Sequence, residues 1–196
     1  MDFYGFDRLD YLKSGHCNYF CSTTAENINS SGRIIMVKTS FQLYNSIMND
    51  EQLVQVSRVF KVTWQQAYRY IFPKDQLLNL DEREWQRSLL QPGRHNIIAV
   101  SDDNQVLGVA SYGRARERTA NRGELMTIYV LPKYQGQGLG DVLLTKAEQG
   151  LHLLNYSHYI LWVLSDNHQA MKFYYNHGWK TNGVIKEKII LGKKFR

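Results

Sequence analysis

From residue 41 onward, the spacing of apolar and polar positions is of two kinds, one typical of strands and one typical of helices. Segments of the two kinds alternate along the chain. Short runs rich in Val, Ile, Leu and Tyr predict β-strands. The turn-forming Ser101-Asp102-Asp103-Asn104 between two of these runs predicts a hairpin. The expected strands are 41–44, 96–100, 106–112, 124–131 and 159–164, with further strand material in 179–191.

Apolar residues three or four positions apart predict helices between those strands, because this spacing places them on one helical face. Capping residues and helix breakers mark where each helix should begin or end. The expected helices run from the Asn49-Asp50 cap toward Pro73, from Asp81 to Pro92-Gly93, over the stripe Leu139–Leu154, and from Ala170 to Gly178. Helices interleaved with strands predict an α/β fold with a mixed central sheet and flanking helices.

Residues 1–35 differ from the rest of the chain. They are rich in Tyr and Phe, are interrupted by glycines and by a polar run, and keep no sustained period. We interpret them as an N-terminal appendage to a domain formed by residues 36–196, and hypothesise that native translation starts at Met36. The alternative is an N-terminal arm that packs through its aromatic side chains.

Length and charge narrow the class of protein. The chain of 196 residues is long enough for one sizeable core. Its apolar runs fall short of the ~18 residues that span a bilayer, and no secretory signal is visible, which excludes a transmembrane protein and makes the cytoplasm the expected location. Lys and Arg number 24 against 18 Asp and Glu, a net charge of +6 that permits contact with phosphates without requiring nucleic acid.

Both cysteines, Cys17 and Cys21, lie within the first 35 residues. This position excludes a disulfide-stapled fold, and it leaves the main domain without a thiol for an acyl-cysteine intermediate. His16 lies beside the pair, but a structural zinc site needs a second pair of ligands, so no metal is expected.

The most informative stretch is Val130–Asp141, in which an expected strand passes through a glycine-dense turn into a helix. Backbone N–H groups converge in such a turn and the helix dipole adds partial positive charge, so the segment suits a phosphate or pyrophosphate. A tight turn that needs Gly for positive φ is the plainer alternative. The dinucleotide fingerprint would need a third glycine where Asp141 stands, and a P-loop would end in Gly-Lys-Ser/Thr, so neither pattern is present.

The spacing Gln135-Gly136-Gln137-Gly138-Leu139-Gly140 matches Gln/Arg-x-x-Gly-x-Gly/Ala and resembles the pyrophosphate loop of the GNAT superfamily of acetyl-CoA-dependent N-acetyltransferases. Residues 167–179 resemble that family's Asn-x-x-Ala-x-x-Phe-Tyr-x-x-x-Gly-Phe, with Trp179 in place of the last Phe. The resemblance spans roughly residues 36–196. It implies the GNAT fold, with the pyrophosphate loop between the fourth strand and the third helix. It also implies an acyltransferase that moves an acetyl group from acetyl-CoA directly to a primary amine, of a polyamine-like small molecule or of a peptide or protein.

Site residues follow from the same resemblance. Glu124 takes the position of a general base for the amine, and Tyr174 that of a general acid for the leaving thiolate. The alternatives are a strand-start charge held by Arg122 or solvent, and a core aromatic residue. The implied cofactor contacts are the backbone of Ile128, Tyr129 and Val130 with the pantetheine arm, the N–H groups of Gln135, Gly136, Gln137, Gly138, Leu139 and Gly140 with the pyrophosphate, and the Asn167 side chain near the thiol. Asp141 stands where relatives often carry Lys or Arg, and brings a carboxylate near the pyrophosphate.

The acceptor is less determined. Its expected rim comprises Trp64, Tyr68, Tyr70, Trp85, Tyr112 and the segment Arg114-x-Arg116-x-Arg118. The aromatic rings could surround an ammonium, whereas the arginines suggest an acceptor or partner with negative charge. The expected partners are acetyl-CoA and an amine. A homodimer and contact with nucleic acid stay open, and no membrane contact is expected. The alternative function is an acyl-CoA-binding or nucleic-acid-binding module on the same fold with little catalysis.

Overall fold

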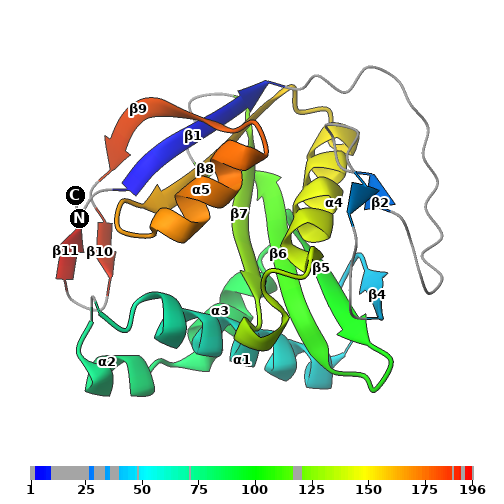
Figure 1. Cartoon of the computed structure of the whole chain (residues 1–196), viewed down its shortest axis with the longest axis vertical. Coiled ribbons are helices and arrows are strands. Elements are labelled where there is room, and N and C mark those ends of the chain that lie inside the picture. The colour runs from blue at the N-terminus through cyan, green and yellow to red at the C-terminus, as the bar shows by residue number, and fades with distance from the viewer. Residues whose placement is uncertain are drawn as a thin grey trace.

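The computed structural model describes residues 3–9, 27–28, 34–35, 40–47, 49–70, 72–116, 121–186, 188–190 and 193–195. Seven of the strands form one sheet with helices on both faces (Figure 1). These strands are β1 (Phe3–Leu9), β4 (Phe41–Tyr44), β5 (Arg94–Ser101), β6 (Val106–Arg114), β7 (Gly123–Val130), β8 (His158–Leu164) and β9 (Lys180–Lys186). Two short hairpins consist of β2 (Asn27–Ile28) with β3 (Ile34–Ile35), and β10 (Lys188–Ile190) with β11 (Lys193–Phe195). The helices are α1 (Asp50–Ala67), α2 (Lys74–Leu78), α3 (Glu82–Leu89), α4 (Leu139–Leu153) and α5 (His168–Asn176), with a 3-10 turn η1 (Pro132–Tyr134).

The strands of the large sheet follow the order β4-β5-β6-β7-β8-β1-β9. Neighbouring strands are antiparallel except β7 and β8, which are parallel. These two strands share only two paired positions, Gly123 with Tyr159 and Glu124 with Ile160. Beyond Glu124 they diverge, as Figure 1 shows, so the edge of β7 that faces β8 lacks a backbone partner in β8. This divergence positions the candidate site.

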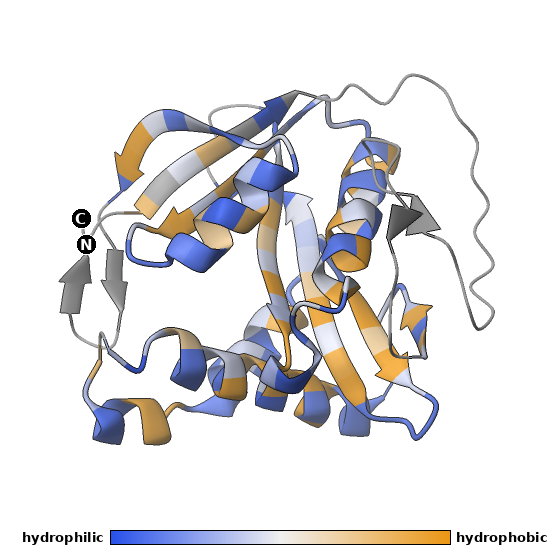
Figure 2. Ribbon diagram, viewed as in Figure 1, coloured by the Kyte–Doolittle hydropathy of each residue, from blue (hydrophilic) through white to orange (hydrophobic). Residues whose placement is uncertain are grey.

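Alternate side chains of the sheet face two different cores, as expected for strands covered on both sides. Ile97 and Ala99 belong to the core that includes the buried face of α4, whereas Ile98 and Val100 belong to the core beneath α1 and α3. In Figure 2 the central strands are largely apolar, and the helices carry polar residues on their outer surfaces. The predicted α/β fold with a mixed sheet and flanking helices is therefore confirmed.

Local capping explains where two of the helices begin. Asn49 Oδ1 accepts a hydrogen bond from Gln52 N at 2.8 Å at the start of α1, and Asp81 Oδ1 accepts one from Arg83 N at 2.9 Å at the start of α3. Both caps were predicted from the sequence. The short helix α2 that follows Pro73 was not predicted, because five residues are too few to set up an apolar stripe.

Strand β1 lies inside the sheet, between β8 and β9. The side chain of Phe6 is fully buried there, and Arg8 Nη1 donates to Glu148 Oε1 on α4 at 2.6 Å. Seven of the first 35 residues thus belong to the central sheet in this structure. A domain boundary at residue 36 and translation from Met36 stay predictions, because Met36 and the segment that holds Cys17 and Cys21 lie outside the described residues.

The predicted elements change in number but not in order. The loop expected between a fourth strand and a third helix lies between β7 and α4, because β1, β2, β3 and α2 add to the count. The strand material expected over 179–191 divides into β9, within the large sheet, and β10, in a separate hairpin. Among the described helices, none combines the length and the apolarity that crossing a membrane requires.

Candidate active site

The glycine loop joins the end of β7, through η1, to the beginning of α4. Gly136 and Gly138 have φ angles of +70° and +85°, a region that favours glycine. Gly138 is the N-cap of α4 and provides no side-chain acceptor, so no side chain caps the first N–H groups of this helix. A Cβ atom at Gly136 would meet nothing within 4 Å. The loop therefore presents backbone donors at an open surface, an arrangement that suits an anion.

Two glutamines fold back onto the loop. Gln135 Nε2 donates to the carbonyl of Val130 at 2.9 Å, and Gln137 Nε2 donates to that of Lys133 at 2.8 Å. Both side chains thus brace the turn by donating to backbone carbonyl oxygens. Leu139 is buried in the core beneath α4, which leaves its backbone as the group available to a ligand.

Asp141, in the first turn of α4, is paired with a histidine. Its Oδ1 lies 2.6 Å from Nε2 of His177, at the C-cap of α5. The expected carboxylate beside the anion loop is present, but it is partly neutralised by this contact. The sequence pattern had not indicated the pairing, because 36 residues separate the two positions.

A cavity of about 700 Å³ lies where β7 and β8 diverge. Side chains from α1, α3, β5, β7, β8 and α5 line it, and Ile128, Tyr129, Asn167 and Tyr174 are among them. Val130 and the loop from Gln135 to Gly140 do not line this cavity; they continue the chain beyond its end. Glu124 lines the same cavity, so five of the predicted site residues meet in one space, and the glycine loop forms a separate part.

Tyr174 is buried on α5 and lines the cavity. Burial raises the pKa of its phenol, and the nearby Tyr129 raises that pKa further, so the hydroxyl keeps its proton at neutral pH. Tyr175, the next residue, is 46% exposed and packs on Phe6 at a ring distance of 5.1 Å. The two tyrosines thus point in different directions, and Tyr174 is the one with access to the cavity.

Asn167 serves as the N-cap of α5, where its Oδ1 accepts a hydrogen bond from Ala170 N at 3.1 Å. Its side chain also interacts with the hydroxyl of Tyr68. Asn167 therefore caps the helix and also lines the cavity.

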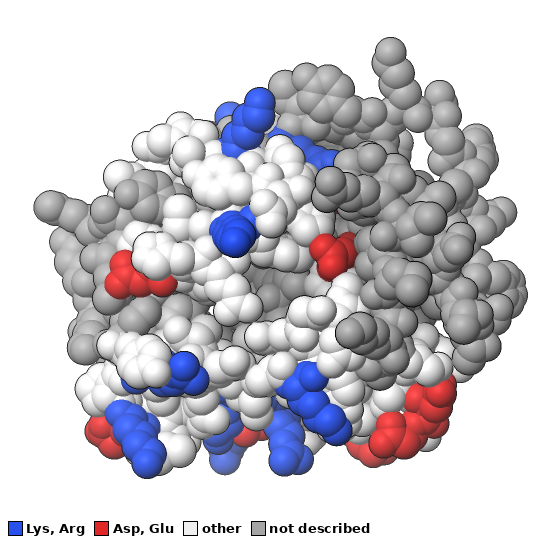
Figure 3. Space-filling view, viewed as in Figure 1, with Lys and Arg blue, Asp and Glu red and all other residues white. Residues whose placement is uncertain are grey.

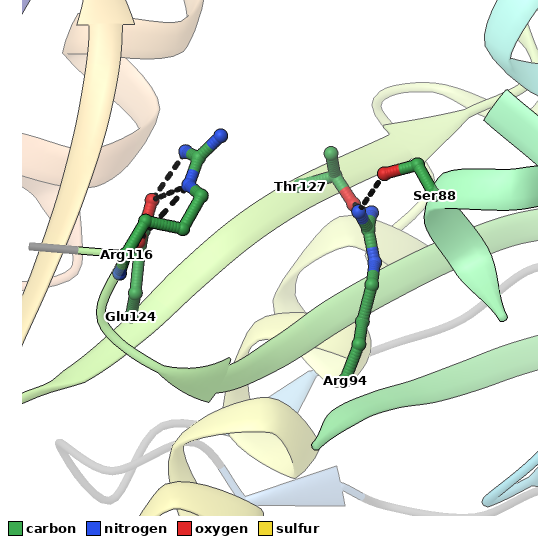
Figure 4. Close-up of polar contacts among 5 residues, drawn as sticks. All are labelled: Ser88, Arg94, Arg116, Glu124 and Thr127. Atoms are coloured by element: carbon green, nitrogen blue, oxygen red, sulfur yellow. Dashed lines mark hydrogen bonds and ion pairs between the residues drawn. The ribbon is translucent and has the colours of Figure 1, made fainter. Parts of the chain in front are cut away.

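Glu124 is 1% exposed and held by one arginine (Figure 4). The backbone N–H of Arg116 donates to Oε2 at 2.9 Å, Arg116 Nε donates to Oε1 at 3.0 Å, and Arg116 Nη2 also donates to Oε1. The sequence had suggested Arg122 or solvent as the partner of this carboxylate, and the partner in the structure is Arg116. Arg122 lies elsewhere, with its carbonyl accepting from Ala115 N across the turn.

Arg94 is a cavity residue that the sequence analysis did not single out. It begins β5, and its Nη1 donates to Ser88 Oγ on α3 at 2.6 Å, while Nη2 lies 3.5 Å from Thr127 Oγ1 on β7 (Figure 4). Its Nε atom is buried without a hydrogen-bond partner. Burial, together with the like charge of Arg116, lowers the pKa of Arg94 to about 10. No sequence motif surrounds Arg94, so only its three-dimensional neighbours show that it lines the site.

Aromatic side chains from α1, α3 and β7 form one wall of the cavity. Trp64 Nε1 donates to the hydroxyl of Tyr129 at 3.0 Å, and Trp64 lies 4.5 Å from Tyr68 and 6.2 Å from Trp85 between ring centroids. Phe60 completes this group at 4.7 Å from Tyr129. Of the residues expected at the acceptor rim, Trp64, Tyr68, Trp85 and Arg116 line the cavity, and their contact with an acceptor stays a prediction.

Three other residues expected at the rim do not line this cavity. Tyr70 is 87% exposed and outside the cavity, Tyr112 stacks on His95 at 5.3 Å, and Arg114 does not line the cavity either. Arg118 lies outside the described residues. Within the described part of the chain, no cluster of His, Cys, Asp and Glu has the composition of a metal site.

Known N-acetyltransferases are similar to this chain in sequence or in structure. It is 30% identical over 119 residues to YuaI, an uncharacterized N-acetyltransferase of Bacillus subtilis strain 168, an alignment that covers 60% of this chain and 69% of YuaI. It is 25% identical over 160 residues to a spermidine N(1)-acetyltransferase of Thermoplasma acidophilum, covering 76% of this chain and 94% of that one. The crystal structure of the PaiA N-acetyltransferase of Thermoplasma acidophilum, in complex with coenzyme A, matches with a TM-score of 0.61 at 18% identity. That match covers 78% of this chain and 92% of PaiA.

At 18% identity the structural likeness concerns the fold. The sequence profile described as the acetyltransferase (GNAT) family matches residues 57–179, which is more than half of the chain and includes both the glycine loop and the Tyr174 motif. In the structure, this loop follows strand β7, which diverges from its parallel neighbour β8. The chain belongs to the GNAT family of acetyltransferases.

Proposed function

We propose that the chain transfers the acetyl group of acetyl-CoA directly to a primary amine of a small molecule or of a peptide. As a GNAT family member it is an acyltransferase that uses acetyl-CoA. The observation that carries the proposal is the cavity between β7 and β8, with Tyr174 on one side and the aromatic wall on the other. Cys17 and Cys21 both precede the matched region, so the proposed transfer uses no acyl-cysteine.

The chain offers two sets of backbone groups to acetyl-CoA. The N–H of Gln135 donates to the carbonyl of Pro132 at 3.2 Å, whereas the loop from Gly136 to Gly140 leads into the positive end of α4, where backbone N–H groups suit the pyrophosphate. The backbone of Ile128, Tyr129 and Val130 lies on β7 beyond its last pairing with β8, so its polar groups on that edge suit the amides of the pantetheine arm. Asn167 would lie near the thiol end of this arm.

Acetyl-CoA supplies the thioester that reacts. The amine nitrogen bonds to the acetyl carbon, the bond from that carbon to sulfur breaks, and the sulfur takes a proton from Tyr174. A phenol that burial keeps protonated can donate in this step. A main-chain N–H in the 128–130 segment would receive the carbonyl oxygen as it gains charge.

The amine must lose a proton before or during the transfer. Glu124 is the proposed acceptor of that proton, directly or through a chain of water molecules. Both of its oxygens are engaged by Arg116, so direct acceptance requires one oxygen to leave that contact.

A thiol-detection assay tests the proposal with the full chain, acetyl-CoA and a panel of amines: spermidine, aminoglycosides, amino acids and short peptides. The expected result is amine-dependent release of CoA, with the acetylated amine identified by mass. The spermidine acetyltransferase relative supports including polyamines. Binding of CoA without turnover of any amine would favour the alternative, an acyl-CoA-binding or nucleic-acid-binding module. Salt-dependent retention of RNA would then identify the second of these.

A further inference from the structure

The cavity contains a guanidinium whose described hydrogen-bond partners are neutral, although the charge of Glu124 also acts on it. Arg94 contacts two neutral hydroxyl groups, of Ser88 and Thr127, and forms no ion pair with any described carboxylate. Its Nε is buried and unpaired. A guanidinium presents five N–H donors in a fork that fits a carboxylate, so this arrangement leaves donors for an anionic ligand.

A second guanidinium lies on the same cavity. Arg116 uses Nε, Nη2 and its backbone N–H on Glu124, whereas Nη1 has no hydrogen-bond partner among the described residues. The side chain of Arg116 is 57% exposed, so this free end faces solvent. The two arginines are close enough for the charge of Arg116 to lower the pKa of Arg94. Figure 4 shows both guanidinium groups on the same side of the strands.

Arg94 lies beside the part of β7 where the proposed reaction takes place. Thr127, which Arg94 contacts, immediately precedes the 128–130 segment of β7 that the proposed function assigns to the pantetheine arm. A carboxylate on Arg94 would therefore lie near the reacting amine. The aromatic wall of Phe60, Trp64 and Trp85 suits an apolar body on the same molecule.

Charged side chains of both signs occur on the described part of the face that Figure 3 shows. In Figure 3, Lys and Arg side chains occur along the edge formed by α1 and α2, with Asp and Glu among them and at their ends. The carboxylates that line the cavity mouth, Asp81 and Glu84, are exposed, so water screens them. Inside the cavity, Glu124 is buried and paired with Arg116, whereas Arg94 is partly buried and forms no ion pair with a described carboxylate.

We propose that the acceptor is a primary amine that also carries a carboxylate, an amino acid with an apolar side chain, and that Arg94 binds the carboxylate with help from Arg116. This inference rests on the proposed acetyl transfer and narrows its substrate class. A polyamine fits the cavity less well, because its second ammonium would lie among two arginines.

Matched substrates test the inference on the unmodified full chain. L-phenylalanine is compared with phenethylamine, and L-leucine with 3-methylbutylamine, because each pair differs only by the carboxylate. We expect kcat/KM to be higher for the amino acid by about tenfold or more, the size of one charge-assisted hydrogen bond. Equal or better turnover of the decarboxylated amines, or of spermidine, overturns the inference while acetyl transfer itself stands. Absence of CoA release with every amine overturns the proposed function instead.

A variant locates the effect at Arg94. Arg94→Gln should lower kcat/KM for L-phenylalanine by about tenfold to one-hundredfold and change that for phenethylamine by less than about threefold. Arg87→Gln, an exposed position on α3 outside the cavity, is the matched control and should change neither value. An equal loss for both substrates in Arg94→Gln would assign Arg94 a structural role and contradict the proposal.

Discussion

His177 Nε2 lies 2.6 Å from Asp141 Oδ1, and this contact joins the end of α5 to the first turn of α4. The two helices bear the two halves of the site, since α4 follows the glycine loop and α5 carries Tyr174. On its other side, His177 Nδ1 lies 2.7 Å from the carbonyl oxygen of Phe173. Burial alone would lower the pKa of His177, but the contacts with Asp141 and Phe173 outweigh it, so the pKa is raised above its ordinary value.

This pair should make stability depend on pH. A histidine whose pKa is raised by folding contributes its full stabilisation below the ordinary pKa of about 6.5, and the contribution is lost as the pH rises through the raised value. His177→Gln should therefore lower the free energy of unfolding by about 1 kcal/mol near pH 5.5 and by clearly less near pH 9. Urea unfolding at both pH values measures this difference. His152→Gln, exposed on α4, is the control, and an identical loss at both pH values for His177→Gln would contradict the argument.

The pair formed by Arg116 and Glu124 should respond unequally to loss of either partner. Glu124 is almost fully buried and the Arg116 side chain is half exposed. Arg116→Ala leaves a buried carboxylate with no guanidinium, so we expect it to lower the free energy of unfolding by about 2 kcal/mol. Glu124→Gln leaves a cation that water can solvate, and about 1 kcal/mol or less is expected. Thermal or urea unfolding compares the two, and a larger loss in Glu124→Gln would disprove the asymmetry.

Local sequence signals predicted the glycine loop and Tyr174, because each of these parts of the site lies within one short segment of the chain. The glycine loop needs positive φ at Gly136 and Gly138, and Tyr174 shares one helix with its motif, so both were visible as spacings. Contacts between residues that the sheet brings together from distant parts of the sequence could not be predicted in this way. Arg94 reaches Thr127 across strands, and Arg116 rather than Arg122 reaches Glu124, and no local spacing indicates either contact.

The same limit applies to the fold. Apolar runs bounded by turn residues predicted β4 to β9, and helical spacings predicted the longer helices, because these signals lie within the sequence of each element. They could not place residues 3–9, because the partners of β1 are β8 and β9, about 150 residues away or more. The aromatic content of that segment was noted, and Phe6 supplies the buried contact that accounts for part of it.

Replacing Tyr174 tests the proposed proton donor. Tyr174→Phe removes only the hydroxyl and should lower kcat by about one-hundredfold or more with little change in stability, since general acid catalysis contributes on that scale. Tyr175→Phe is the neighbouring control and should retain full turnover. Because the pKa of Tyr174 is raised, activity of the unmodified chain should not fall through loss of this proton below about pH 10. Steady-state CoA release over that pH range measures both effects, and full turnover in Tyr174→Phe would remove the residue from the mechanism.

Strand β1 should contribute to stability through Phe6. Its ring is fully buried between the sheet and α5, with Tyr174 at 6.3 Å and Tyr175 at 5.1 Å between ring centroids. Phe6→Ala would leave a cavity in this core, and a loss of about 3–5 kcal/mol in the free energy of unfolding is expected. Tyr70→Ala, at an exposed position, removes a similar ring and should change stability by less than about 0.5 kcal/mol.

A chain that begins at Met36 extends this test to the whole strand. Without β1, the facing edges of β8 and β9 lose their backbone partner, and Glu148 loses the guanidinium of Arg8. We therefore expect residues 36–196 to unfold at a lower urea concentration than residues 1–196. Equal stability of the two chains, together with a mass that begins at Met36 for protein made from its own mRNA, would instead favour the hypothesis that residues 1–35 are an appendage. Because Phe6 packs on Tyr174, loss of turnover in the shorter chain at concentrations where it remains folded would link β1 to the position of the proton donor.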